Sequence, residues 1–156
     1  MGRLLYMRIE SYHKEHFETC MQIIQSNTPK YILPIEHLDF KKYLLKEDKT
    51  YFVFFKNNNL VACGGYGLNE TKTKAGLCWG LVHRKYHKQG YGSRSLKYRL
   101  NHIMSNYPEI EIHLDTSQHT HRFFEKFGFI TEQITKNGYG EGLDKYDMTL
   151  NKDSNL

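Results

Sequence analysis

The segment that decides the fold runs from residue 81 to residue 93 and reads Leu-Val-His-Arg-Lys-Tyr-His-Lys-Gln-Gly-Tyr-Gly-Ser. The apolar run from Ala75 to Val82 predicts a strand that leads into it, and periodic apolar residues after it predict a helix. A short basic loop between a strand and a helix favours anion binding, because its N–H groups are free and the helix start carries partial positive charge. Gly90 and Gly92 alone would equally allow a plain tight turn. No Gly-Lys-Ser/Thr of a Walker loop follows, and no third glycine completes a dinucleotide fingerprint.

The pattern continues downstream as a helix and a strand. The apolar face of the helix is formed by Leu96, Leu100, Ile103, Met104 and Tyr107. Pro108 ends this helix, and residues 110–114 then alternate between apolar and polar side chains, as in a half-buried strand. A strand, a helix and a strand in this order predict a right-handed crossover with parallel pairing.

The flanking segments complete a mixed pattern of helices and strands. The turn Asn57-Asn58-Asn59 between two β-type runs predicts a hairpin. The Gly-rich stretch Gly138–Gly142 and its neighbour Asn137 predict a loop between the last two strands. We expect strands at residues 4–9, 51–55, 60–63, 75–82, 110–114, 130–135 and 146–150, and helices at 17–28, 34–46, 91–107 and 120–126, the last capped by Gly128.

Size and composition limit the classes of protein. With 156 residues, 39% of them hydrophobic, we expect a single domain over residues 1–150 and a flexible tail over residues 151–156. The net charge of +5 favours anionic partners without choosing among them. Cys20, Cys63 and Cys78 have no metal-type spacing and predict small core residues in a reducing compartment. No apolar run is long enough for a signal peptide or a membrane helix, so we expect a cytoplasmic protein without a membrane partner.

Two separated motifs resemble those of the GNAT family of N-acetyltransferases. That family has a strand, then Val-x-Pro, then [Arg/Gln]-x-x-Gly-x-[Gly/Ala]; here the strand ends at Val82 and His87-Lys88-Gln89-Gly90-Tyr91-Gly92 occupies the loop. The second motif is Arg122-Phe123-Phe124-Glu125-Lys126-Phe127-Gly128-Phe129, similar to the family's Phe-Tyr-Glu-Lys-x-Gly-Phe. The order of the predicted elements also matches from Leu4 to Leu150.

The resemblance implies an α/β (α+β) fold and a cofactor. The fold is a mixed, mostly antiparallel central sheet of six to seven strands, with a parallel pair splayed around the cofactor and helices on both faces. The cosubstrate is acetyl-CoA, and the reaction is direct transfer of the acetyl group to an amine. The cofactor-binding residues carried over are Leu81, Val82 and His83 along the pantetheine arm, and His87, Lys88, Gln89, Gly90, Tyr91, Gly92 and Ser93 around the pyrophosphate, with Ser117 and Phe124 at further family positions.

Three of these positions depart from the family pattern. His87 replaces the usual Arg or Gln, which weakens one contact and leaves the backbone cradle intact. Ser117 replaces an Asn that bonds to pantetheine. Phe124 replaces a Tyr whose hydroxyl protonates the departing thiolate, so general-acid catalysis by this residue is lost.

Candidates for acid–base catalysis therefore come from elsewhere. His83 and Asp115 lie near the ends of the two strands expected to splay, and they are the candidate bases; His113 and Glu141 are alternatives. Tyr139 is the candidate acid, and Tyr91 and Tyr146 are alternatives to it. Each of these is also explained by ordinary packing or a surface position. Trp79 and the loop Gly138–Gly142 are candidates for the acceptor pocket.

Other functions remain open at this point. Phe124 and the lack of an evident base also fit a binding module that holds acyl-CoA without turnover. Basic and aromatic residues from His83 to Arg99 allow nucleic-acid binding, although the cofactor's phosphates explain the same charges. We expect no metal, since His113, His119 and His121 lack a matching ligand pattern. The sequence leaves open the amine acceptor and whether the chain forms a homodimer.

Overall fold

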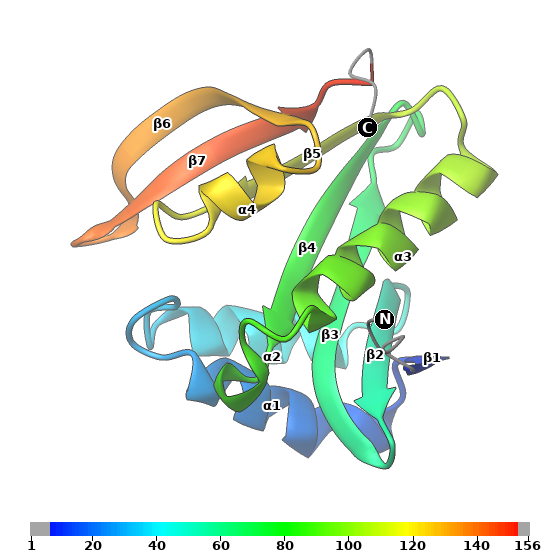
Figure 1. Cartoon of the computed structure of the whole chain (residues 1–156), viewed down its shortest axis with the longest axis vertical. Helices are drawn as coiled ribbons and strands as arrows, with labels where there is room; N and C mark the ends of the chain where they lie inside the picture. Colours follow the sequence, from blue (N-terminus) through cyan, green and yellow to red (C-terminus); the bar gives the residue numbers. More distant parts are fainter. Residues whose placement is uncertain (1–6, 153–156) are drawn as a thin grey trace, which may run out of the picture.

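A computed structural model describes residues 7–152, which form a seven-stranded sheet with helices on both faces (Figure 1). The strands lie in the order β1-β2-β3-β4-β5-β7-β6, and every neighbouring pair is antiparallel except β4 and β5. The strands are β1 Arg8–Ser11, β2 Thr50–Lys56, β3 Asn59–Leu68, β4 Lys74–Val82, β5 Glu111–Thr116, β6 Phe129–Gly140 and β7 Leu143–Leu150. The helices are α1 Phe17–Ser26, α2 Glu36–Leu45, α3 Tyr91–Asn106 and α4 His121–Glu125, with short 3-10 turns η1 Lys14–His16 and η2 Arg84–Tyr86.

The predicted β2–β3 hairpin is confirmed. Lys56 pairs with Asn59, so Asn57 and Asn58 form the turn, and Asn57 has a φ of 56°. Asparagine tolerates this left-handed conformation better than most residues, which explains why the Asn-rich segment closes the hairpin.

The parallel pairing of β4 with β5 is also confirmed, but it is short. Only Lys74, Ala75 and Gly76 pair with β5, opposite Glu111, Ile112 and His113. Beyond Gly76 the two strands diverge, and β4 runs down toward α1 and α2 while β5 leads away beside β7 (Figure 1). This divergence opens one side of the sheet at the carboxyl ends of both strands.

Each face of the sheet has its own core. On one face, α3 packs over β3 and β4 through Leu96, Leu100 and Ile103, all predicted as its apolar face. On the other face, α1 and α2 enclose a second cluster around Ile23, Phe40 and Val53; Figure 1 shows α3 in front of the strands and α2 behind them.

Several predicted boundaries are wrong. The first strand runs from Arg8 to Ser11 and so extends past the predicted end at residue 9, while the predicted start at residue 4 lies outside the described residues. The second helix begins at Glu36, after Pro34, rather than at it. Met104, predicted on the apolar face of α3, is 36% exposed, because it lies at the margin of that face.

The Gly-rich segment near the C-terminus is mostly strand, not loop. β6 extends through Asn137 to Gly140, and Gly140 pairs with Leu143, so that only Glu141 and Gly142 form the turn. Irregular register between Thr135 and Gly140 accommodates the glycines within the strand. The predicted flexible acceptor loop is therefore the tip of a long hairpin.

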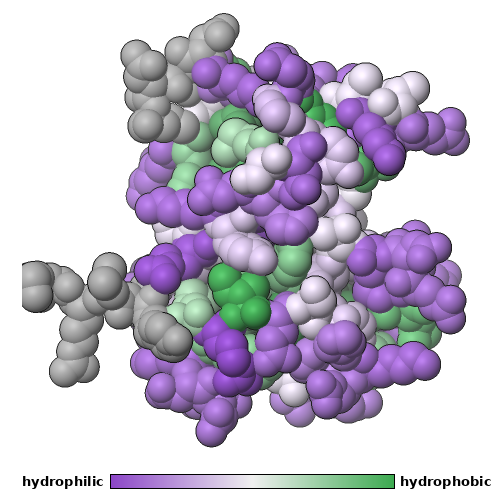
Figure 2. All heavy atoms as spheres, turned by 90° about the vertical axis from the view of Figure 1, so that its right-hand side faces the viewer, coloured by the Kyte–Doolittle hydropathy of each residue, from purple (hydrophilic) through white to green (hydrophobic). Residues whose placement is uncertain are grey.

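The side of the molecule away from the diverging strands is largely hydrophilic, with hydrophobic side chains in small separate patches (Figure 2). Within residues 7–152, no helix is long and apolar enough to cross a membrane. The opening between β4 and β5 lies on the other side of the molecule (Figure 1).

Candidate active site

The loop between β4 and α3 presents an uncapped helix start. Lys88 and Gly90 both adopt left-handed φ angles, 62° and 89°, and α3 begins directly after Gly90. Arg94 donates the first helical hydrogen bond to Gly90 O, at 3.1 Å, and no side chain of the described residues caps the helix. The N–H groups of the first turn thus stay available to an anion, which favours phosphate binding.

Gly92 leaves room in the same turn. A Cβ atom placed on it would lie 3.6 Å from Val82 Cγ2 and 3.7 Å from Phe123 Cζ. Gly92 therefore faces both the end of β4 and α4, and a larger side chain at this position would occupy the space between them. Phe123 was missed by the sequence reasoning, although it stands beside Phe124 in the second motif.

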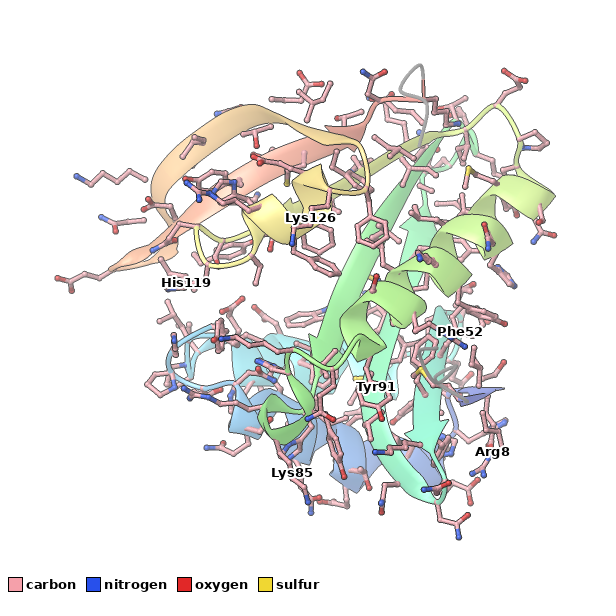
Figure 3. The ribbon with its side chains drawn as sticks, viewed as in Figure 1. Arg8, Phe52, Lys85, Tyr91, His119 and Lys126 are labelled. Carbon is pink, nitrogen blue, oxygen red and sulfur yellow. The ribbon has the colours of Figure 1, made fainter. Side chains whose placement is uncertain are left out.

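The side chains of the loop face in different directions. Lys88 and Gln89 are exposed, and Gln89 Nε2 donates to Lys85 O at 3.2 Å. Tyr91, labelled in Figure 3, is only 1% exposed and packs edge-on against Tyr86, so it offers its backbone rather than its phenol. Ser93 is half-buried in the first turn of α3.

His87 turns its ring away from the helix start. Its Nε2 lies 2.9 Å from Val82 O, and its ring packs edge-on against Tyr31 with centroids 5.3 Å apart. The Val82 carbonyl also accepts a hydrogen bond from Asn27 Nδ2 at 3.0 Å. Asn27 is 3% exposed and donates to Ile23 O as well, so it ties the end of α1 to the end of β4.

The segment between α1 and α2 spans the opening. Tyr31 contacts His87 on one side and, with ring centroids 5.8 Å apart, His119 on the other. Figure 3 shows His119 extending from the β5–α4 connection toward this segment. Leu33 meets the tip of the β6–β7 hairpin, since a Cβ atom on Gly140 would lie 2.3 Å from its Cδ1. No local pattern in the sequence indicates these contacts of Asn27, Tyr31 and Leu33.

The two candidate bases are not brought together. His83 follows the end of β4, where its Nδ1 accepts a hydrogen bond from Lys85 N at 3.2 Å. Continuing the register from Gly76 and His113 places Asp115 level with Cys78, well before His83 along β4. Burial, aided by Lys85 and His87, lowers the pKa of His83, which favours its neutral form.

Asp115 is paired with Tyr139 instead. The Tyr139 hydroxyl donates a short hydrogen bond to Asp115 Oδ1, which joins β6 to β5 across β7. Burial raises the pKa of Tyr139, and the charges of Asp115, Glu36 and Asp147 raise it further. The phenol therefore keeps its proton at neutral pH and shares it with the Asp115 carboxylate.

This end of the site is acidic, whereas the loop end is basic. Burial raises the pKa of Glu36, and the neighbouring carboxylates of Asp115 and Asp39 add to the shift. Glu36 Oε2 accepts a hydrogen bond from Leu33 N at 2.9 Å, which fixes it at the start of α2. The site thus offers N–H groups and cations at one end and carboxylates at the other.

The remaining predicted residues occupy supporting positions. Ser117 is 5% exposed, and its Oγ accepts from His119 N at 3.2 Å. Phe124 packs against Phe123 and Phe129 in the core of the α3 face. Trp79 contacts Phe40, with ring centroids 5.0 Å apart, and Leu81 is buried beside the same cluster. Trp79 is thus largely a core residue, with a φ of 46° that marks an irregularity in β4.

The histidines near α4 do not converge. His121 stacks on Tyr146 and lies 3.1 Å from Glu125, whereas His119 faces Tyr31. In the part of the chain that the structure describes, no group of three His, Cys, Asp or Glu side chains is placed to hold a metal ion. A surface hollow of about 620 Å³ lies elsewhere, beside Tyr43 and Gly67.

Comparisons with known proteins agree with this geometry. A family model described as the acetyltransferase (GNAT) family matches residues 9–129. No curated protein matches the sequence. A protein from Desulfovibrio desulfuricans assigned to the GNAT family superposes with a TM-score of 0.79 at 18% identity, over 93% of this chain and 98% of the other.

Two further solved structures share the fold. A ribosomal-protein alanine N-acetyltransferase from Escherichia coli has a TM-score of 0.77 at 17% identity, over 97% of this chain and 100% of its own. An aminoglycoside N-acetyltransferase complexed with coenzyme A has a TM-score of 0.74 at 14% identity, over 91% and 95% of the two chains. At these identities the likeness concerns the fold.

Proposed function

The chain belongs to the GNAT family of acetyltransferases, and we propose that it transfers the acetyl group of acetyl-CoA to a primary amine of a small molecule or peptide by direct attack. The observation that carries the proposal is the uncapped start of α3, with Lys88 and Gly90 in left-handed conformations, after the end of β4 that has diverged from β5. A phosphate-binding loop next to an opened pair of strands suits a long ligand with a pyrophosphate at one end.

The cofactor assignment follows from this arrangement. The N–H groups of Tyr91, Gly92 and Ser93 hold the pyrophosphate, with exposed Lys88 adding positive charge. The pantetheine arm runs along Leu81 to His83, past Gly92 and Phe123. Ser117 directly follows β5, the opposite strand. Its Oγ accepts a hydrogen bond from His119 N, and its own hydroxyl proton can still be donated to the ligand.

Asp115 and Tyr139 divide the proton transfers. The Asp115 carboxylate takes a proton from the attacking amine and passes it to Tyr139, its hydrogen-bond partner, as the phenol gives its own proton to the leaving sulfur. His83, neutral at pH 7, is the alternative base, but it lies at the phosphate end of the site. The general acid lost at Phe124 is thereby replaced from β6.

The acidic end of the site favours a positively charged acceptor. Asp115 raises the pKa of Glu36, and both carboxylates raise the pKa of Tyr139, so an ammonium group there gains from nearby carboxylates. The net charge of +5 repels cationic acceptors weakly at long range. At contact distance the nearby carboxylates determine the interaction, because salt screens the more distant charges. We also propose a reducing, cytoplasmic setting, because Cys20, Cys63 and Cys78 are all free.

Calorimetric titration tests the cofactor assignment. We expect acetyl-CoA to bind with micromolar affinity and acetyl-pantetheine, which lacks the pyrophosphate, to bind at least about a hundredfold more weakly. Equal affinity for the two ligands would refute the role of the loop. Binding of neither ligand would refute the proposed function.

A second candidate is a non-catalytic module that holds acyl-CoA. It is favoured by Phe124, whose ring is packed among Phe123 and Phe129 and carries no acidic proton. This module would bind acetyl-CoA as tightly as an enzyme and release no CoA when amines are added. Turnover above the uncatalysed background would exclude it.

A further inference from the structure

Arg99 is a buried cation in an unusual place on α3. Its side chain is 5% exposed and lies on the helix face that packs on β3 and β4. A Cβ atom on Gly64 would lie 2.9 Å from Arg99 Cζ, and one on Gly80 would lie 2.8 Å from its Nη2. The guanidinium therefore rests directly on the backbone of both strands, with no side chain between.

The charge of Arg99 is poorly compensated. Nε donates to Ser95 O and Nη1 to Gly65 O, both at 3.4 Å, which is long for a hydrogen bond. Among residues 7–152, no carboxylate forms a salt bridge with it. Ser95 Oγ, one turn earlier and also buried, finds no hydrogen-bond partner within the same range. Burying a charge without a carboxylate partner disfavours the folded state, so stability does not explain Arg99.

Gly80 connects this charge with the active site. Cys63 pairs with Leu81 and Gly65 with Cys78, so both Trp79 and Gly80 stand opposite Gly64 as a bulge. The bulge lies in the part of β4 that has left β5, and Gly80 is exposed although Arg99 behind it is not. The guanidinium of Arg99 thus lies behind the backbone of β4 at Gly80, and the other side of that backbone is exposed.

We propose that Arg99 is a positioning residue whose charge acts across the Gly80 bulge to stabilise negative charge on the reacting thioester; this rests on the proposed function. The amine nitrogen forms a bond to the carbonyl carbon, and the π electrons move onto the oxygen. When the carbonyl reforms, the carbon–sulfur bond breaks and its electron pair goes to sulfur. The amine loses one proton, sulfur gains one, and the products are an amide and CoA. A fixed cation in a dry setting favours both negative intermediates without touching the substrate.

The test separates charge from packing. Arg99→Met keeps the length of the side chain and removes its charge, and Arg99→Lys keeps the charge. We expect Arg99→Met to lower kcat on the order of tenfold, with KM for acetyl-CoA within about twofold, and to unfold at the same or higher denaturant concentration. Arg99→Lys recovers most of kcat. Lys56→Met removes an exposed charge at the end of β2 and leaves kcat unchanged.

Three results would overturn the inference. The first is an unchanged kcat in Arg99→Met, and the second is a lower unfolding midpoint, or failure to fold, in that variant. The third is a kcat of Arg99→Lys no higher than that of Arg99→Met. A second readout needs no acceptor: the thiol of bound CoA, followed by thiolate absorbance, should titrate about one pH unit higher on Arg99→Met than on the unsubstituted chain. Bound CoA without this difference refutes the role of Arg99, whereas failure to bind CoA refutes the proposed function itself.

Discussion

Gly90 and Lys88 show how single residues shape the loop. Both have left-handed backbone conformations, which cost an ordinary residue about 1–2 kcal/mol and glycine almost nothing. Lys88 bears this cost and Gly90 avoids it, so the loop turns sharply while keeping the N–H groups of α3 free. This conformation, and not a side-chain contact, is the basis of the proposed phosphate site.

Replacing Gly90 tests that point. We expect Gly90→Ala, at a φ of 89°, to lower the free energy of unfolding by about 1 kcal/mol and to weaken CoA binding at least about tenfold. Gly142→Ala is the matched control, since its φ is 81° and no atom lies within 4 Å of an added Cβ. Denaturation and calorimetry on both variants should show equal losses of stability and a loss of CoA affinity only in Gly90→Ala. Equal affinities would contradict the proposal.

Side chains far apart in the sequence set the rest of the site. Tyr139 and Asp115 each appear among the sequence candidates, yet their hydrogen bond depends on the pairing of β6, β7 and β5. Arg99 occupies a helix position where spacing predicts an apolar residue. Its neighbours Gly64 and Gly80 belong to other strands, so spacing along the helix could not reveal the contact.

At the scale of elements, the end of β4 is held by α1. Val82 O accepts hydrogen bonds from Asn27 and lies within bonding distance of His87. These contacts fix the strand where the loop begins. They also join the two faces of the sheet at the opening.

Asn27→Leu should therefore destabilise the fold. Loss of its donor leaves carbonyls of Ile23 and Val82 less satisfied in a buried place, which costs about 1–3 kcal/mol. Asn106→Leu is the control, because its bond to His102 O is exposed, and we expect a change within about 0.5 kcal/mol. Urea denaturation compares the two. If Asn27→Leu costs no more than the control, the connection does not hold β4.

Elements with strong local periodicity were predicted well. The β2–β3 hairpin, α3 and the alternating strand β5 have their predicted character, since each buries one regular face. The prediction of a loop over Gly138–Gly142 was wrong. Glycines favour a loop locally, but the end of β6 still pairs with β7 through an irregular register. The short extent of the parallel ladder was implied by family resemblance and by no pattern in the residues.

The whole molecule separates charge along its site. Basic residues gather around the β4–α3 loop and carboxylates around Tyr139, which a single net charge conceals. Its interior also contains several tyrosines and cysteines whose pKa values burial raises, among them Tyr12, to about 12, and Tyr51.

Stability should consequently fall at alkaline pH. Tyr12, Tyr43, Tyr51 and Tyr139 hold their protons longer in the folded state, so above about pH 10 the unfolded state binds fewer protons. Their contribution is complete below that pH and is lost as the pH rises. Lys49 and Arg99, whose pKa values burial lowers, act in the opposite direction but are fewer than the four tyrosines. We expect a lower urea midpoint at about pH 10.5 than at about pH 8, and the midpoint should recover when the sample is returned to the lower pH. An unchanged midpoint would contradict this.

The central claim is direct acetyl transfer at the opening between β4 and β5, and amine-dependent release of CoA tests it most directly. Initial rates are measured with acetyl-CoA and a panel containing a diamine, a monoamine and a neutral amide. We predict CoA release that requires an amine, is fastest with the diamine and follows sequential kinetics, while the mass of the protein stays unchanged. Acetyl-CoA that binds but is never released as CoA with any amine, or a protein that itself becomes acetylated as an intermediate, would contradict it.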